Sequence, residues 1–311
     1  MQIYFYRRSE QQPNFGDELN DWLWEKLLPG VFDDNENTAF LGIGSLLNHL
    51  VSERVPNARQ IVVFSTGVGY VGYSGASYKE GMPKVDDSWK IYCVRGPFSA
   101  YKLGLPPEYA VTDGAVLVRR VFKPTEPKRY KYSYMPHFTQ SIHGGQSWSE
   151  VCQLAGVNYI DARWPIEKVL TQISQTEVLL TEALHGAIIA DSLRVPWICI
   201  QTALERLLPF KWQDWCESIQ VAYRPYGLME LRDLKPQQGI QGIWKIRGSR
   251  AAIMTSLTHH YNKQKTAEKM IDLTQRVQPN LSDDAHIEGL TVELETRLER
   301  FKQDVQAGKF S

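Results

Sequence analysis

The sequence lacks the features that define several large classes of protein. It contains no apolar run of about 18 residues, so we expect no membrane-spanning helix. Lysine plus arginine equals aspartate plus glutamate at 35 each, and this neutral balance argues against a basic nucleic-acid-binding surface. The N-terminal residues lack the basic-then-apolar order of a signal peptide. Together these absences predict a soluble, cytoplasmic protein that binds no nucleic acid.

Common catalytic and metal-binding signatures are also missing. The four cysteines stand singly, without the CxxC pairs of zinc sites and redox motifs. The sequence contains no P-loop lysine, no GxSxG elbow and no HExxH motif. His137, His143 and His185 are too scattered to have the spacing of metal ligands, and no acidic cluster suggests magnesium. We therefore expect no resident metal or cofactor.

The sequence does contain a regular alternation of short apolar runs with amphipathic stretches. The apolar runs begin near residues 2, 38, 60 and 89, and again near residues 130, 156, 176 and 195. Strands that alternate with helices predict parallel sheets covered on both faces. The polar stretch 123–129 separates the two sets of runs. This organisation predicts an α/β fold with two Rossmann-like domains facing a cleft.

We expect the two domains to span residues 1–122 and 130–241. The C-terminal segment 242–311 differs, because its pattern is helical and polar. Its apolar residues recur near helical spacing at Ile287, Leu290, Val292, Leu294 and Leu298. We expect this helix to pack either on a neighbouring domain or on a second subunit, the latter giving a homo-oligomer.

Doubly wound sheets bind ligands at the corners where strands end and helices begin. At the first corner, "PNFGDELN", Gly16 allows a tight turn and Asp17 is well placed to cap the following helix. Asn14 has no such structural role, which makes it a candidate ligand contact. At the second corner, "LGIGSLL", Gly44 and Ser45 would let a ligand approach free backbone N–H groups.

Further corners carry charged or titratable side chains. Arg95 follows a strand and can grip a phosphate or carboxylate with its planar fork, the alternative being a surface ion pair. Asp113 precedes a helix that it can cap. In the second half, His137 follows a strand, and His143 lies in a glycine-containing loop, "SIHGGQS".

The last corner, "TEALHGAII", places His185 and Gly186 between a buried strand and a helix. An imidazole there can act as a general acid near neutral pH, and the helix N-terminus can hold an anion. The alternative is a histidine hydrogen-bonded in the core. Taken together, the glycines, histidines and arginine of these corners predict a binding site for a small anion.

In this order, these residues resemble the polysaccharide pyruvyl transferase family. The resemblance covers about residues 3–200 and rests on Asn14-x-Gly16-Asp17, Gly42-x-Gly44-Ser45, Arg95 with Ser99, Asp113, and Leu184-His185-Gly186. The chain departs from the family pattern at two positions. Ala183 stands where a serine is usual, and Gly114 stands where a proline is usual.

The resemblance implies a fold similar to the two-domain glycosyltransferases of the B type. It implies transfer of pyruvate from phosphoenolpyruvate, bound by the C-terminal domain, to hydroxyls of a saccharide bound by the N-terminal domain. The product would be a pyruvate ketal of an exopolysaccharide or cell-surface polysaccharide. The acceptor would be a polymer precursor or a lipid-linked saccharide, the latter bringing the protein to the inner face of the plasma membrane.

The resemblance also implies roles for individual residues. His185 would be the general acid, with His137 in reserve, and Arg95 would bind an acidic group of phosphoenolpyruvate. The substrate-binding residues would be Asn14, Gly16, Asp17, Gly44, Ser45, Asp113, Glu182 and Gly186.

Two alternatives remain at this stage. The first is a nucleotide-sugar glycosyltransferase of the same fold, in which Glu182 or Glu205 would bind the ribose. The second is a non-catalytic scaffold in polysaccharide assembly, which the departures at Ala183 and Gly114 keep open.

Overall fold

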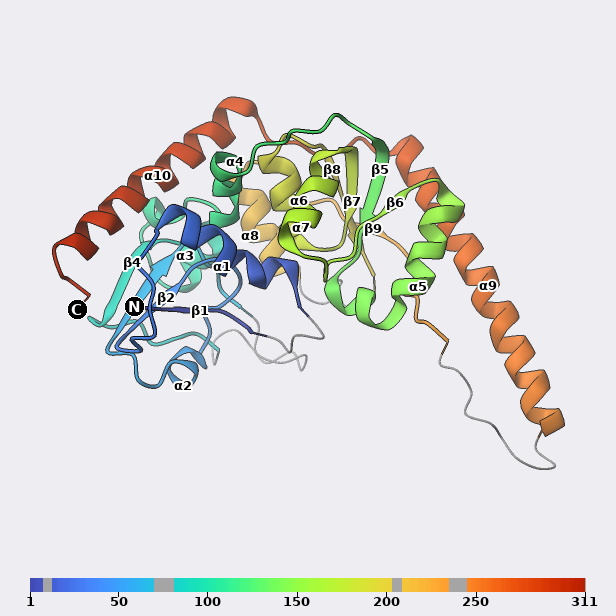
Figure 1. The fold of residues 1–311 in the computed structure, drawn as a ribbon, viewed down its shortest axis with the longest axis horizontal. Helices are drawn as coiled ribbons and strands as arrows, with labels where there is room; N and C mark the ends of the chain where they lie inside the picture. The colour runs from blue at the N-terminus through green and yellow to red at the C-terminus, as the bar shows by residue number, and fades with distance from the viewer. Residues whose placement is uncertain (8–12, 70–80, 203–208, 235–244, 311) are drawn as a thin grey trace.

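The structure is a computed structural model that describes residues 1–7, 13–69, 81–202, 209–234 and 245–310. Its strands form two parallel sheets with helices packed around them (Figure 1). The predicted α/β class is therefore confirmed. Residues 122–129 join the two sheets without forming a helix or strand, while the predicted domain boundaries stay a prediction.

The first sheet has the strand order β1-β2-β3-β4. Its strands are Gln2–Tyr4, Thr38–Leu41, Gln60–Phe64 and Trp89–Cys93. Phe40 of β2 lies between Ile3 of β1 and Val62 of β3. Strand β2 is buried along its whole length, as expected for an apolar strand with helices on both faces. All four strands form where the apolar runs predict them.

Short helices connect these strands. They are α1 (Phe15–Leu27), α2 (Val51–Arg54), α3 (Pro97–Lys102), the 3₁₀ helices η1 (Pro107–Tyr109) and η2 (Gly114–Leu117), and α4 (Val118–Val121). Helix α1 buries Leu19, Leu23 and Trp24. The Trp24 ring meets Phe40 and Phe64 edge to face, with ring centroids 5.3 Å apart in both pairs, and so holds α1 on the sheet.

The second sheet has the order β6-β5-β7-β8-β9, which is the flavodoxin-like order 2-1-3-4-5. Its strands are Tyr130–Met135 (β5), Asn158–Tyr159 (β6), Thr176–Thr181 (β7), Trp197–Gln201 (β8) and Tyr226–Gly227 (β9). Its helices are α5 (Phe138–Ala155), α6 (Ile166–Ser174), α7 (Leu184–Ser192) and α8 (Phe210–Ser218). The strand order reverses at β5, because β6 lies on one side of it and β7 on the other. Sheets of this kind bind ligands at this switch point, next to the ends of β5 and β7.

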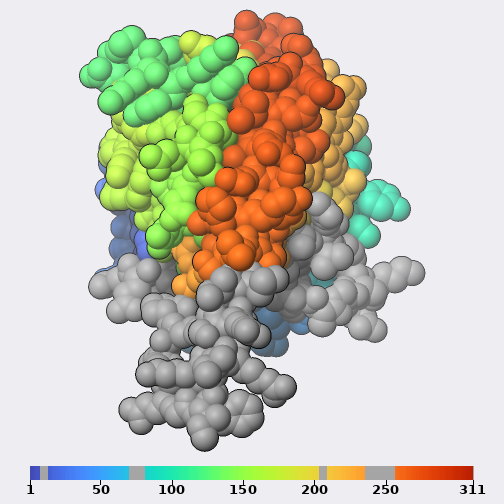
Figure 2. Space-filling view, turned by 90° about the vertical axis from the view of Figure 1, so that its right-hand side faces the viewer, coloured from blue at the N-terminus to red at the C-terminus, as the bar shows by residue number. Residues whose placement is uncertain are grey.

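Two long helices complete the chain, α9 (Lys245–Arg276) and α10 (Asp284–Gln306). Helix α9 packs along α5, as Figure 2 shows in orange and green. Helix α10 returns to the first sheet, where the Phe301 ring lies 5.4 Å from both Phe40 and Tyr92. The expected packing on a neighbouring part of the chain is confirmed, and a second subunit stays untested. Val292 is 49% exposed, because it lies off the buried face.

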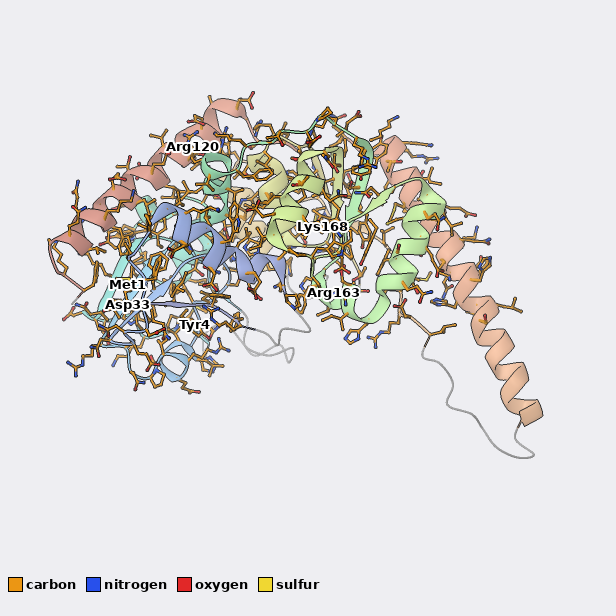
Figure 3. The ribbon with its side chains drawn as sticks, viewed as in Figure 1. Met1, Tyr4, Asp33, Arg120, Arg163 and Lys168 are labelled. Carbon is orange, nitrogen blue, oxygen red and sulfur yellow. The ribbon has the colours of Figure 1, made fainter. Side chains whose placement is uncertain are left out.

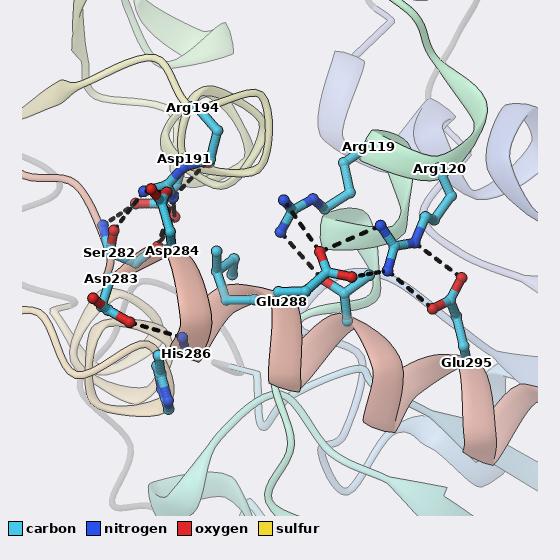
Figure 4. A network of polar contacts seen from close by, with 12 residues as sticks. Arg119, Arg120, Asp191, Arg194, Ser282, Asp283, Asp284, His286, Glu288 and Glu295 are labelled. Carbon is cyan, nitrogen blue, oxygen red and sulfur yellow. Dashed lines mark hydrogen bonds and ion pairs between the residues drawn. The ribbon is translucent and has the colours of Figure 1, made fainter.

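Ion pairs fix α10 against the rest of the chain (Figure 4). Arg120 of α4 binds Glu288 and Glu295, one on each side of its guanidinium. Figure 3 shows Arg120 below α10 and Arg163 beside the first turns of α5. Since α4 also contacts α7 of the second half, these pairs hold α10 across both sheets.

Candidate functional site

His185 lies at the corner between β7 and α7, as the sequence predicts, and only 15% of its side chain is exposed. The N-terminus of α1 covers it. A Cβ atom at Gly16 would lie 2.1 Å from Nδ1 of His185, so only glycine fits there. The Phe15 N–H donates to the Ala162 carbonyl (2.9 Å), which docks α1 on the second half of the chain. Gly16 is thus a contact residue inside a helix, and the expectation that it forms a tight turn is wrong.

Asn14, not Asp17, caps α1. Its Oδ1 accepts from the Gly16 N–H (3.3 Å), while its Nδ2 donates to Oδ2 of Asp17 (2.8 Å). The helix begins at Phe15, which places Asp17 inside the first turn, where a carboxylate interacts favourably with the helix dipole. The expected cap at Asp17 is therefore wrong. Substrate binding by either residue stays a prediction.

Asp113 comes from the first half of the chain and is fully buried. As expected it caps a helix, because its Oδ1 accepts from the Ala115 N–H (3.0 Å) at the start of η2. Its Oδ2 lies 3.8 Å from Nε2 of His185. Both of these atoms are buried and have no hydrogen-bond partner among the described residues. The structure thus brings together two predicted site residues from different halves, next to the switch point of the second sheet.

Ser65 is a candidate site residue that the sequence does not mark. It follows β3, is fully buried, and has a φ of 68°, a strained value for a residue other than glycine. Its hydroxyl also has no partner among the described residues. A Cβ atom at Gly114 would lie 2.2 Å from this hydroxyl, so a proline would not fit at that position. A strained backbone and an unpaired buried hydroxyl are typical of functional sites.

Burial controls the charge of the Asp113–His185 pair. It raises the pKa of the Asp113 carboxyl from 3.8 to about 6, despite the opposing Ala115 N–H and Arg95. Burial, followed by the positive charges of Lys211 and Arg95, lowers the pKa of His185 from 6.5 to about 3. At pH 7 the pair therefore consists of a neutral imidazole and a carboxylate close to its own pKa. A proton added to the free site would therefore reside on Asp113, the more basic of the two groups.

Arg95 is fully buried, and its contacts are with the protein itself. Its Nε donates to Oδ2 of Asp214 (2.9 Å) on α8, and its other nitrogens donate to Ser45 Oγ (2.7 Å) and the Val68 carbonyl (3.3 Å). The Ser99 N–H and hydroxyl also bind Asp214, at 2.9 and 2.6 Å. The alternative of a surface ion pair is thus wrong. These contacts give no support to direct anion binding by Arg95.

Gly44 and Ser45 belong to the same buried network. Gly44 has a φ of 120°, and its carbonyl accepts from the Gly67 N–H and the Thr66 hydroxyl, both at 3.0 Å. The Ser45 hydroxyl accepts from Arg95. Both residues therefore have a structural role in the turn after β2. Their contact with substrate stays a prediction.

In the second half, hydrogen bonds to Glu182 link the ends of three strands, β5, β7 and β8. Its carboxylate is fully buried and accepts from the His137 N–H (3.1 Å), the Thr202 N–H (2.8 Å) and the Thr202 hydroxyl. His137 begins α5, and its Nδ1 lies 2.8 Å from the Thr139 hydroxyl. A Cβ atom at Gly186 would lie 2.6 Å from the Thr181 hydroxyl, so this glycine allows close packing.

The predicted loop around His143 is helical instead. Residues 138–155 form α5, which kinks at Gly144, and His143 is exposed. The glycines that suggested a loop serve a close contact, because a Cβ atom at Gly144 would lie 2.3 Å from the Leu231 carbonyl. His143 thus lies in a helix instead of in a loop at the end of a strand.

The described part of the chain lacks two further features. No group of three or more His, Cys, Asp and Glu side chains there could hold a metal ion. No helix there is long and apolar enough to cross a membrane.

Comparisons with known proteins match this chain over most of its length. Residues 38–202 match the family described as polysaccharide pyruvyl transferase. The chain is also 38% identical over 227 residues to the succinoglycan biosynthesis protein ExoV of Rhizobium meliloti (strain 1021). That alignment covers 72% of this chain and 67% of the relative. The family match runs from β2 to the end of β8 and includes Ser65, Arg95, Asp113 and His185.

Replacing Arg95 with lysine tests whether the guanidinium is structural. The Arg95→Lys variant keeps the charge but loses several hydrogen bonds to buried acceptors, and bonds to charged groups contribute roughly 1.5–3 kcal/mol each. We expect the free energy of unfolding to fall by about 2–4 kcal/mol in urea titrations. Arg276→Lys is the control, since Arg276 is 80% exposed in its ion pair and should change stability by less than about 0.5 kcal/mol. Equal stabilities of the two variants would show that Arg95 does not hold the network together.

Replacing Asp113 with asparagine tests the unpaired carboxylate. The folded protein binds the Asp113 proton more tightly than the unfolded chain, so this group's stability contribution is lost as pH rises through about 6. Asparagine can still cap η2 but carries no charge. We expect the Tm of Asp113→Asn to exceed that of the wild type by more at pH 8 than at pH 5. The exposed Asp87→Asn serves as the control, and a Tm difference independent of pH would contradict the raised pKa.

Proposed function

Because the chain belongs to the polysaccharide pyruvyl transferase family and is a pyruvyltransferase enzyme, we propose that phosphoenolpyruvate is its donor. The acceptor is a saccharide, and the product is a pyruvate ketal across two of its hydroxyls. The similarity to a succinoglycan biosynthesis protein supports a role in exopolysaccharide synthesis. The observation that carries the proposal is the buried pair of Asp113 and His185 at the switch point of the second sheet.

The reaction requires a proton donor beside an anion. A proton adds to the methylene carbon of the donor, and a saccharide hydroxyl attacks the electron-poor carbon next to it. The bond to phosphate breaks, and a second hydroxyl closes the ketal. Of the two hydroxyl protons, one ends in the new methyl group and the other on the released phosphate. One site must therefore both accept and donate protons.

The Asp113–His185 pair can move these protons. His185 is neutral in the free protein, and an arriving phosphate dianion favours its charged form. The first turn of α7 adds N–H groups and a helix dipole that attract the same anion. Nε2 faces Asp113, which leaves Nδ1, beside Gly16, as the nitrogen that serves the substrate. Asp113 stabilises the imidazolium and can hold the proton between the two steps.

The architecture we propose is a two-domain arrangement of the B type, with the acceptor on the side of the first sheet and the donor on the side of the second. We place the reaction in the cytoplasm. A lipid-linked acceptor would add peripheral contact with the inner face of the plasma membrane.

The contacts of Glu182 argue against a nucleotide-sugar glycosyltransferase. Its carboxylate already accepts hydrogen bonds from His137 and Thr202, which leaves it poorly placed to bind a ribose. The other candidate, Glu205, lies outside the described residues.

Local packing accounts for the two departures that suggested an inactive scaffold. At Gly114, the Ser65 hydroxyl occupies the space that a proline ring or any other side chain would need. At Ala183, the backbone N–H donates to the Thr181 hydroxyl (3.0 Å), so a threonine two residues earlier supplies an oxygen at this corner. Both positions are therefore compatible with an active enzyme.

Replacing the two histidines separately tests the proposal. Positioned acid catalysis contributes about 10²–10⁴ in rate, so His185→Ala should reduce turnover by that factor. His185→Gln should bind the donor and turn over poorly, while His137→Ala should retain most activity. The assay measures phosphate release from phosphoenolpyruvate and the mass gain of galactosides, glucosides and mannosides. Normal turnover in His185→Ala together with an inactive His137→Ala would show that His137, and not His185, is the acid.

A further inference from the structure

The donor needs a cation that the predicted site does not supply. Phosphoenolpyruvate carries a phosphate and a carboxylate, and the family resemblance implies that Arg95 binds one of them. In the structure, Arg95 donates to Asp214, Ser45 and backbone carbonyls, and its side chain is fully buried. A cation outside this network would complete the anion site alongside the N–H groups at the start of α7.

Lys211 lies where such a cation is needed. It stands in the first turn of α8, which follows β8, and β8 pairs with the strand that carries His185 at its end. Asp214 is three residues further along α8, so the two side chains share one face of the helix. That face meets the first half of the chain, because Asp214 binds Arg95 and Ser99. Lys211 thus lies at the carboxyl ends of the strands, between the two halves.

The electrostatics of His185 agree with this position. After burial, the charge of Lys211 is the largest effect that lowers the pKa of His185, ahead of Arg95. Lys211 is half-buried, and its charge adds a positive potential at the imidazole. A dianion bound there would offset the repulsion between the lysine and a protonated His185.

We propose that Lys211 binds the phosphate of phosphoenolpyruvate and holds it beside His185. The ammonium is a compact point charge suited to a phosphate oxygen, while Arg95 and Asp214 fix the helix that carries it. Lys211 is a substrate-binding residue, and His185 remains the proton donor. This assignment rests on the proposed function, because it takes phosphoenolpyruvate as the donor.

The test measures donor binding by thermal shift and donor kinetics by phosphate release. In Lys211→Gln, the phosphoenolpyruvate concentration for half-maximal stabilisation and the KM should each rise at least 10-fold, while kcat at saturation changes by less than 5-fold. Lys211→Arg should restore most of the affinity. The control is Lys302→Gln, because Lys302 pairs with Glu299 on α10. Donor affinity of Lys211→Gln equal to that of the wild type would overturn the assignment.

A second probe separates this assignment from the proposed function. Inorganic phosphate should stabilise the wild type and the control but not Lys211→Gln. If phosphate does so while phosphoenolpyruvate has no effect on the wild type, the donor is wrong and the phosphate site at Lys211 stands. If neither anion stabilises the wild type, both proposals fail. Loss of the folded state in Lys211→Gln would show that Lys211 has a structural role and would overturn the assignment.

Discussion

The contact between Asp113 and His185 is the constraint on which the rest of the structure depends. Two buried polar atoms face each other at 3.8 Å without another partner among the described residues, an arrangement that costs stability. Several elements hold it in place. The N-terminus of α1 covers His185 at Gly16, η2 fixes Asp113 through its cap, and α7 begins at the corner that presents the imidazole. The protein retains a buried pair whose hydrogen bonds are incompletely satisfied, which is typical of a group with a chemical task.

A second set of contacts keeps the two halves in register around this pair. The buried ion pair of Arg95 and Asp214 joins the end of β4 to α8. Helix α10 spans the molecule and binds Arg120 through Glu288 and Glu295. A buried guanidinium whose hydrogen bonds are satisfied by the protein is a positioning element.

The sequence predicts the parts of this architecture that depend on local pattern. Eight apolar runs become strands, and the strand-to-helix corner of His185 and the helix cap at Asp113 form where expected, because burial periodicity and helix caps are local properties. In the described chain no strand directly precedes Asp113, however, so the expected strand-to-helix corner there is wrong. Strand β9 was missed, since two residues carry no pattern. Contacts between distant segments could not be read from spacing. Arg95 and Asp214 are 119 positions apart, and Gly16 meets a histidine 169 positions later in the chain. The positive φ of Ser65 likewise has no sequence signal, because serine rarely adopts it.

The central claim is that burial keeps His185 neutral until a donor anion arrives. Imidazole ¹⁵N NMR measures this most directly, with His185 assigned by comparison with a spectrum of His185→Gln. In the free protein, the His185 nitrogens should keep neutral shifts well below pH 6, consistent with a pKa of about 3, and phosphoenolpyruvate should raise that pKa. Titration of His185 near its ordinary value of 6.5 in the free protein, unchanged by the donor, would contradict the account.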